Sequence, residues 1–197
     1  MKVKHIGWIA TLGLVLAGCA QPPAADIDAA KLALDEARQA QAAEYAQQSW
    51  TTAQDAESKL ELELDAQERR WSAMRSYTTA RQLAQDTKAA AERSRDEAIA
   101  GKDKAKTEVS TLMAAARDEV GRAHAAVASA PKGKGTEADL ASLRSDTSSL
   151  DDTLAEMQKL FDGGQYNEAK VKAQAAIDAA KQVEAEIEKA KGQRRSA

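Results

Sequence analysis

Mostly apolar residues recur at alternating intervals of three and four towards the end of the chain. The first run is Leu140, Leu143, Thr147, Leu150, Leu154, Met157 and Phe161. The second run is Tyr166, Ala169, Ala173, Ala176, Ala180, Val183, Ile187 and Ala190. Because residues three and four apart share one face of an α-helix, each run predicts a helix with a single buried face.

The glycine pair Gly163-Gly164 separates the two runs. So short a turn makes the two helices antiparallel neighbours, and the leucine-rich face of the first then packs against the alanine-rich face of the second. Alanine allows the helix axes to approach closely, while leucine fills the space between them. We therefore predict a helical hairpin over residues 137–191.

The same spacing occurs earlier in the chain, which indicates a diverged internal repeat of two hairpins. The positions that correspond to the first run are Trp50, Ala53, Glu57, Leu60, Leu64, Gln67 and Trp71. Tyr77, Ala80 and Ala84 correspond to the start of the second run. The earlier copy lacks a glycine turn, so residues 64–74 form either a turn or part of one continuous helix.

Alanine accounts for 45 of the 197 residues, whereas the chain has one Phe, three Tyr and three Trp. Alanine is the strongest helix former, and β-strands favour the β-branched and aromatic residues that are scarce here. The chain is therefore predicted to be all-α, with elongated antiparallel helical hairpins in a coiled-coil-like bundle.

A long helix is expected between the two copies. A helix over residues 72–128 would be roughly 85 Å long at a rise of about 1.5 Å per residue. Residues 101–106 predict a solvated bend in it, because Lys102 and Lys106 fall on the apolar stripe. That stripe consists of Val109, Leu112, Ala116, Val120, Ala123 and Val127.

Residues 1–18 have the features of a lipoprotein signal peptide. Lys2 and Lys4 precede an uncharged segment over residues 6–16, which is shorter than the ~20 residues that a membrane-spanning helix needs. The segment ends in Leu16-Ala17-Gly18-Cys19, which resembles the bacterial lipobox. The resemblance implies cleavage between Gly18 and Cys19 and lipidation of the Cys19 thiol.

Acyl chains on Cys19 would attach the chain to a membrane, since each buried methylene contributes ~0.8 kcal/mol and two or three chains hold stably. By resemblance to Gram-negative lipoproteins, Ala20 implies the outer membrane, facing the periplasm, rather than the inner membrane. The formal net charge of −3 argues against nucleic acid as a partner, because nucleic acid requires clustered positive charge.

Proline and glycine divide the chain after the signal peptide. We expect an acylated tether over residues 19–25, an N-terminal long helical hairpin region over residues 26–130, and a Pro/Gly linker over residues 131–136. The C-terminal hairpin over residues 137–191 and a basic tail over residues 192–197 follow.

The chain resembles a family of bacterial lipoproteins that share an alanine-rich helical domain of unknown function. The resemblance rests on Glu44-Tyr45-Ala46-Gln47, where the family usually has a proline in place of Gln47, and on the Tyr-x-x-Ala-x-x-x-Ala segments that start at Tyr77 and Tyr166. It implies an envelope location and helical hairpins, and it brings no established activity.

Candidates for chemistry are few. His124 is the only histidine after the signal peptide, and neither a second His nor a Cys accompanies it, so no catalytic residue, metal site or cofactor is predicted. Trp50, Trp71, Tyr45 and Tyr77 are candidate partner contacts, and each could instead anchor a thin core.

These features predict a non-enzymatic, lipid-anchored envelope protein that acts as a periplasmic helical spacer or protein-interaction scaffold. An envelope protein is the expected partner, and a homo-oligomer is the other association that the sequence leaves open. The alternative is a tetratricopeptide-like peptide-binding or chaperone-like module, because the Tyr-x-x-Ala-x-x-x-Ala segments are similar to the helix pairs of those repeats.

Overall fold

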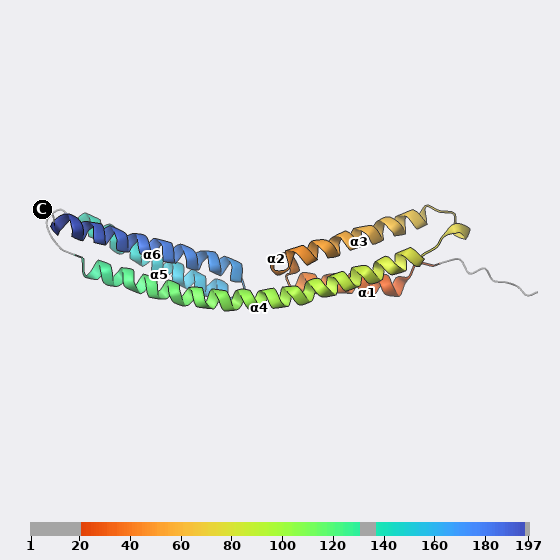
Figure 1. Ribbon diagram of the computed structural model, residues 1–197, viewed down its shortest axis with the longest axis horizontal. Coiled ribbons are helices and arrows are strands. Elements are labelled where there is room, and N and C mark those ends of the chain that lie inside the picture. The colour runs from red at the N-terminus through yellow and green to blue at the C-terminus, as the bar shows by residue number, and fades with distance from the viewer. Residues whose placement is uncertain (1–20, 131–136, 196–197) are drawn as a thin grey trace, which may run out of the picture. The chain divides into compact units, whose positions relative to one another are not determined.

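The computed structural model describes residues 21–130 and 137–195, and every regular element within them is helical. The elements are α1 (Ala24–Gln39), α2 (Ala42–Tyr45), α3 (Gln47–Glu68), the 3-10 helix η1 (Ser72–Met74), α4 (Thr78–Ala128), α5 (Glu137–Asp162) and α6 (Tyr166–Arg195) (Figure 1). The all-α prediction is confirmed.

The described residues divide into two compact units. Unit 1 contains residues 21–43 and 47–95, and unit 2 contains residues 44–46, 96–130 and 137–195. The division falls inside α4, which therefore contributes its first part to unit 1 and the remainder to unit 2. The expected linker at residues 131–136 lies outside the described residues.

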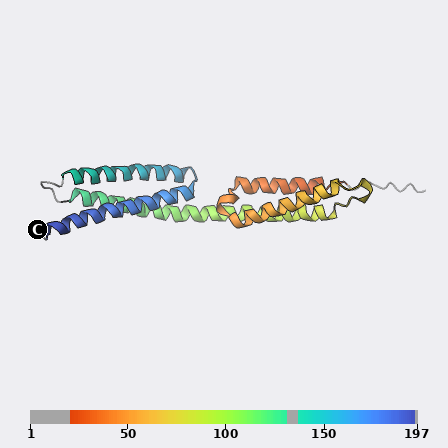
Figure 2. The same cartoon turned by 90° about the horizontal axis from the view of Figure 1, so that it is seen from above.

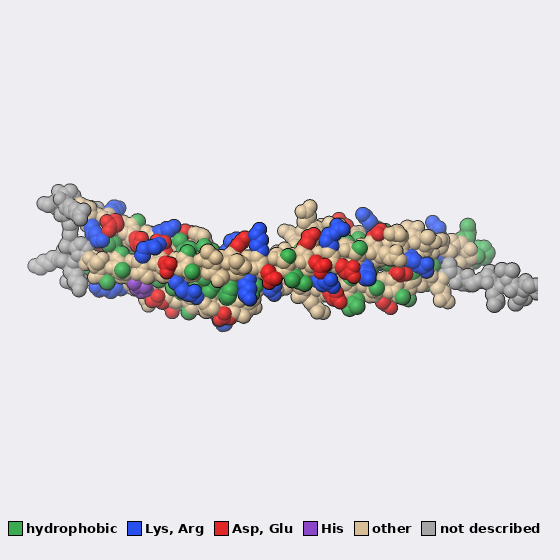
Figure 3. All heavy atoms as spheres, turned by 60° about the horizontal axis from the view of Figure 1, so that its bottom comes forward, with side chains coloured by type: hydrophobic (Ala, Val, Ile, Leu, Met, Phe, Trp, Pro, Cys, Tyr) green, Lys and Arg blue, Asp and Glu red, His purple; other side chains and the backbone are tan. Residues whose placement is uncertain are grey.

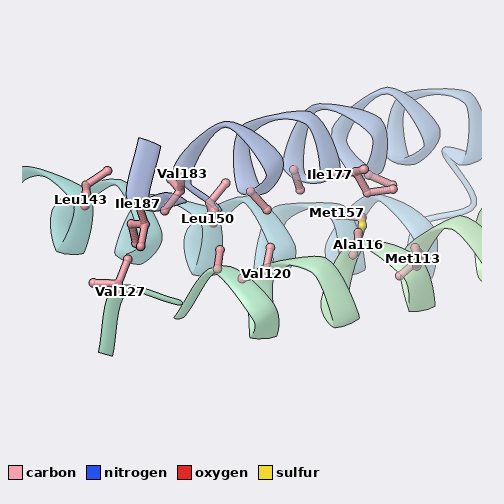
Figure 4. Packing of buried hydrophobic residues seen from close by; sticks show 14 of the residues in the cluster. Met113, Ala116, Val120, Val127, Leu143, Leu150, Met157, Ile177, Val183 and Ile187 are labelled. Atoms are coloured by element: carbon pink, nitrogen blue, oxygen red, sulfur yellow. The ribbon is translucent and has the colours of Figure 1, made fainter. Parts of the chain in front are cut away.

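Three helices build the core of unit 2. The predicted hairpin is present as α5 and α6, and the second part of α4 packs against both of them (Figure 4). Of the positions predicted to be buried in these three helices, Leu112, Leu154, Phe161 and Tyr166 are only partly buried and Ala190 is exposed. The buried cluster comprises Val109, Met113, Ala116, Val120, Ala123, Val127, Ala130, Leu140, Leu143, Leu150, Met157, Ala169, Ala173, Ala176, Ile177, Ala180, Val183 and Ile187.

The turn between α5 and α6 needs glycine at one position. Gly164 has a φ of +75°, a left-handed backbone that L-residues with a Cβ rarely adopt. The N–H of Gly163 donates to the carbonyl of Lys159 at 3.0 Å, and the N–H of Gln165 donates to the carbonyl of Leu160 at 2.9 Å. These bonds satisfy carbonyls at the end of α5 and reverse the chain.

Unit 1 also contains three long helical segments: α1, α3 and the first part of α4 (Figure 2). The largest side chains in its core are Leu34, Trp50, Leu60 and Tyr77. Alanines fill the remaining space between the helices: Ala30, Ala33, Ala37, Ala42, Ala53, Ala80, Ala84 and Ala91 are all at most 4% exposed. The hairpin of the earlier copy thus has α1 as a third helix.

The chain turns within residues 64–74, so the continuous-helix alternative is wrong. Helix α3 ends at Glu68, and α4 begins at Thr78 after η1. A break also occurs beside Tyr45, although Gln47 and not proline stands there. Helix α1 ends at Gln39, Gln41 has a positive φ of 61°, and Ala46 separates α2 from α3.

Helix α4 continues through residues 101–106, so the charged segment at the predicted bend does not interrupt the helix. Asp103, Lys104 and Lys106 are exposed, so their charges stay in solvent without interrupting the helix. The Lys104 ammonium lies 3.9 Å from the carboxylate of Glu108, a spacing of four residues that supports a helix.

Positions that share a register in the predicted repeat differ in polarity between the two units. Unit 1 buries Gln67, Thr87 and Ser94, whereas the positions of the same register in unit 2 are Met157, Ala176 and Val183. The hydroxyl of Thr87 donates to the carbonyl of Leu83 at 2.8 Å, within its own helix. The hydroxyl of Ser94 is fully buried and has no hydrogen-bond partner. At these three positions the core of unit 1 is the more polar of the two.

Candidate functional site

The residues predicted for cleavage and lipidation, Gly18 and Cys19, lie outside the described residues. The first helix begins at Ala24, five positions after Cys19. The N–H of Ile27 donates to the carbonyl of Pro23 at 3.0 Å, so α1 is regular from its first turn. Within residues 21–130 and 137–195, no helix combines the length and apolar character needed to cross a bilayer.

Trp50 and Tyr77 are core residues rather than exposed partner contacts. Trp50 is 8% exposed, and the guanidinium of Arg38 lies 5.6 Å from the centre of its ring. Tyr77 is 7% exposed and packs with Leu60, Ala80 and Ala84. Of the two roles left open for these side chains, the structure gives both of them the packing role.

Trp71 has the opposite environment and is 76% exposed. The helical spacing placed it on the buried stripe of α3, but α3 ends at Glu68, so Trp71 lies in the following loop. Met74, three residues further on, is 70% exposed. Two large apolar side chains therefore project into solvent from one short loop, which we call the tip loop (Arg69–Arg75).

Hydrogen bonds from two side chains fix the tip loop. The guanidinium of Arg75 donates to the carbonyl of Glu68 at 2.9 Å and to that of Arg70 at 3.1 Å. The side-chain carbonyl of the buried Gln67 accepts a bond from the N–H of Ser76 at 3.0 Å. The Arg75 bonds satisfy two backbone carbonyls at and just after the end of α3, and the Gln67 bond satisfies the N–H of Ser76, so both sides of the loop are fixed.

The tip loop is cationic as well as apolar. It contains Arg69, Arg70 and Arg75 and no acidic residue. Arg75 is engaged by backbone carbonyls, whereas Arg69 and Arg70 are exposed. Among the residues that the structure describes, neither Arg69 nor Arg70 forms an ion pair. The loop thus combines an indole, a thioether and two available guanidinium groups.

Tyr45 is half-buried and contacts other parts of unit 2. Its hydroxyl lies 3.5 Å from the carbonyl of Gly164, and the ammonium of Lys102 lies 5.9 Å from the centre of its ring. Its backbone carbonyl lies directly against Gly101 of α4, where an added Cβ would be 2.5 Å from the carbonyl oxygen. Burial and the neighbouring charge of Glu44 raise the pKa of the Tyr45 phenol. Tyr45 therefore has a structural role.

A groove of about 400 Å³ lies between α5 and α6. The buried side chains of Leu150 and Val183 form its floor. Polar and small side chains form its rim: Asp146, Ser149, Thr153, Ala179, Gln182 and Glu186. No group of three or more His, Cys, Asp or Glu side chains in the described part of the chain is arranged to hold a metal ion.

The tip loop is the feature that sequence spacing missed. Arg69, Arg70 and Met74 were not among the predicted contacts, although Arg-Arg-Trp-Ser-Ala-Met-Arg is a distinct cationic and apolar segment. Of the four predicted contacts, Trp71 alone is largely exposed. Comparison with family models, with curated proteins and with solved structures gives no match to this chain.

Proposed function

We propose that this chain is a non-enzymatic, lipid-anchored protein of the cell envelope that acts as a helical spacer or protein-interaction scaffold in the periplasm. The observation that carries the proposal is α4, whose 51 residues form one helix that supplies the third helix of both units. A helix shared in this way connects two small bundles without a loop. Closely packed alanines, rather than a wide apolar interior, close the core of unit 1.

The anchor is tested on the N-terminus of the protein purified from the envelope of its host or of a Gram-negative host. Mass spectrometry should find a diacylglyceryl group on the Cys19 thiol at the new N-terminus. Cys19→Ser removes the thiol and should abolish both the modification and cleavage after Gly18. An unmodified wild-type Cys19 would refute the anchor. Separation of the two membranes by density then tests the outer-membrane location.

The spacer role is tested by small-angle scattering of the protein without its acyl chains. A compact domain of this length has a radius of gyration of about 16 Å. A spacer requires a clearly larger value, and a value close to that of the compact domain would refute this role.

The scaffold role is tested with photo-crosslinking residues in intact cells. Leu62 and Val171 are 70% and 68% exposed, on α3 and α6 respectively, and suit this purpose. A scaffold should give the same captured protein repeatedly from one position, and the capture should be lost with Cys19→Ser. Absence of any captured protein at all exposed positions would refute a scaffold.

The tetratricopeptide-like peptide-binding module is the second candidate, and the groove between α5 and α6 favours it. Its apolar floor and acidic rim suit a short basic peptide with an apolar side chain. A photo-crosslinker at Gln182, on the rim, should then capture added basic peptides, whereas one at Val171 should not. Equal capture at both positions would refute a binding groove.

A further inference from the structure

We propose that the tip loop (Arg69–Arg75) docks on the surface of the same membrane that holds the acyl chains of Cys19. This inference rests on the lipid anchor proposed above. It adds a second membrane contact, made by side chains, to the one made by acyl chains. The contact would orient unit 1 on the membrane surface instead of leaving it free to rotate on its tether.

The first argument is that the tip loop and the start of α1 lie at the same end of unit 1. The carboxylate of Asp26, in the first turn of α1, lies 3.4 Å from the guanidinium of Arg81 in the first turn of α4. The side-chain amide of Gln85 donates to the same carboxylate at 3.4 Å. Ile27 packs against the cluster that contains Tyr77, the residue just before α4. Figures 1 and 2 show the start of α1 beside the η1 turn from two directions.

The second argument is the length of chain between the anchor and this end. Five residue steps separate Cys19 from Ala24, where α1 begins. A fully extended chain spans at most about 3.6 Å per residue, so this segment reaches about 18 Å at most. That distance is shorter than a lipid bilayer is thick. An acylated Cys19 would therefore hold the start of α1, and with it the tip loop, close to the lipid headgroups.

The third argument is chemical. An indole ring prefers the boundary between headgroups and acyl chains, because its apolar body and its N–H need different surroundings. Trp71 and Met74 are 76% and 70% exposed, so both are available for insertion. Figure 3 shows hydrophobic side chains gathered at this end of the unit. Arg69 and Arg70 beside them provide the positive charge that anionic headgroups attract.

The fourth argument is that the charge of the tip loop departs from that of the whole chain. The formal net charge of the chain is −3, yet every charged side chain of the loop is positive. The hydrogen bonds from Arg75 and Gln67 already hold the loop in shape. Little ordering is therefore needed on binding, which favours a weak surface contact. Such a contact gains strength when a tether keeps the two surfaces together.

The test measures whether Trp71 of the lipidated full-length mature protein meets lipid. The protein is reconstituted into vesicles of phosphatidylethanolamine and phosphatidylglycerol that contain a brominated phospholipid, which quenches nearby tryptophan. Trp50 is the other tryptophan after the signal peptide, and it is buried. The Trp71→Phe variant therefore measures the emission of Trp50 alone, which is subtracted as background. We expect the Trp71 emission to shift to shorter wavelength and to lose most of its intensity.

Two variants separate the contributions of the loop. Trp71→Phe/Met74→Ser should weaken the contact between the tip loop and the membrane. This weakening is measured as a greater accessibility of unit 1 to a water-soluble spin or fluorescent label. Arg69→Gln/Arg70→Gln should reduce the Trp71 quenching, as should replacing phosphatidylglycerol by phosphatidylcholine. Leu62→Ser is the matched control, since Leu62 is 70% exposed on α3 outside the loop, and it should change nothing.

The outcomes distinguish the loop from the anchor. If vesicles retain the protein but Trp71 stays unquenched and open to acrylamide, the loop proposal is wrong and the anchor stands. If the protein carries no acyl groups and does not bind to the vesicles, both the anchor and the loop proposal fail. If Trp71 is shielded only when a second protein is added, the loop is a protein contact and the membrane proposal is overturned.

Discussion

Replacing Gly101 by alanine tests the close contact between α4 and the backbone of Tyr45. In the interior of a helix, this change normally stabilises a protein by about 1 kcal/mol, because alanine loses less conformational entropy than glycine. Gly121, in the same helix, is exposed, and apart from its own stretch of helix backbone no atom lies within 4 Å of a new Cβ. Gly121→Ala should therefore stabilise the protein by about this amount.

At Gly101 the same gain meets a steric cost. The new Cβ would lie 2.5 Å from the carbonyl oxygen of Tyr45 and 3.3 Å from its carbonyl carbon and its Cβ. The carbonyl must therefore move, and overpacking of this kind costs about 1–3 kcal/mol. We expect Gly101→Ala to be neutral or destabilising by up to about 2 kcal/mol.

Urea unfolding followed by circular dichroism measures both free energies of unfolding under identical conditions. The two variants should differ by about 1–3 kcal/mol, and by several degrees in melting temperature, since 1 kcal/mol shifts a chain of this size by about 2–4 °C. Equal stabilisation by both substitutions would refute the contact.

Three further predictions concern stability. Leu150→Ala should cost ~2–4 kcal/mol, because Leu150 is 5% exposed in the core of unit 2, whereas Val171→Ala, at a site 68% exposed, should cost little in the same urea titration. Ser94→Ala should stabilise unit 1 by about 1 kcal/mol, because it removes a buried hydroxyl that has no partner; a loss of stability on calorimetry would show that the hydroxyl is paired. The phenol of Tyr45 has a pKa raised above 10.0 by burial and by the charge of Glu44, so the unfolded chain ionises first and stability falls as the pH rises past that value. Tyr45→Phe should lose less stability over the same pH range, and equal losses in the two proteins would contradict this assignment.

The faces of α5 and α6 could be predicted from spacing alone. Leu150, Met157 and Val183 are buried as their intervals require, because a helix of fixed period leaves little choice of face. The same intervals could not show which helix meets each face. The third helix of unit 2 was therefore missed as a partner of the hairpin, although its own stripe had been recognised.

Two features could not be predicted from the sequence, for local physical reasons. Gly101 could have meant a break, a left-handed turn or a close approach, and only the position of Tyr45 distinguishes these roles. The sequence spacing predicts that the helix extends to Trp71, since neither proline nor glycine follows Glu68 directly. At the helix end the guanidinium of Arg75, seven residues away, donates to the carbonyl of Glu68, and the side chain of Gln67 accepts a bond from the distant N–H of Ser76. Side-chain capping over such a distance leaves no periodic signal.

The residues that α4 buries in unit 1 are smaller and more polar than those it buries in unit 2, and this difference affects the dynamics of the helix. Its first part buries Thr87 and Ser94 among alanines, whereas its second part buries Val109, Met113 and Val120. Each buried methylene adds about 0.8 kcal/mol, so the second part has the larger free energy of local opening. Amide hydrogens of one uninterrupted helix should therefore exchange with solvent at two rates. The slow set should belong to the second part, so the helix would fray from its unit 1 end under conditions that leave unit 2 folded.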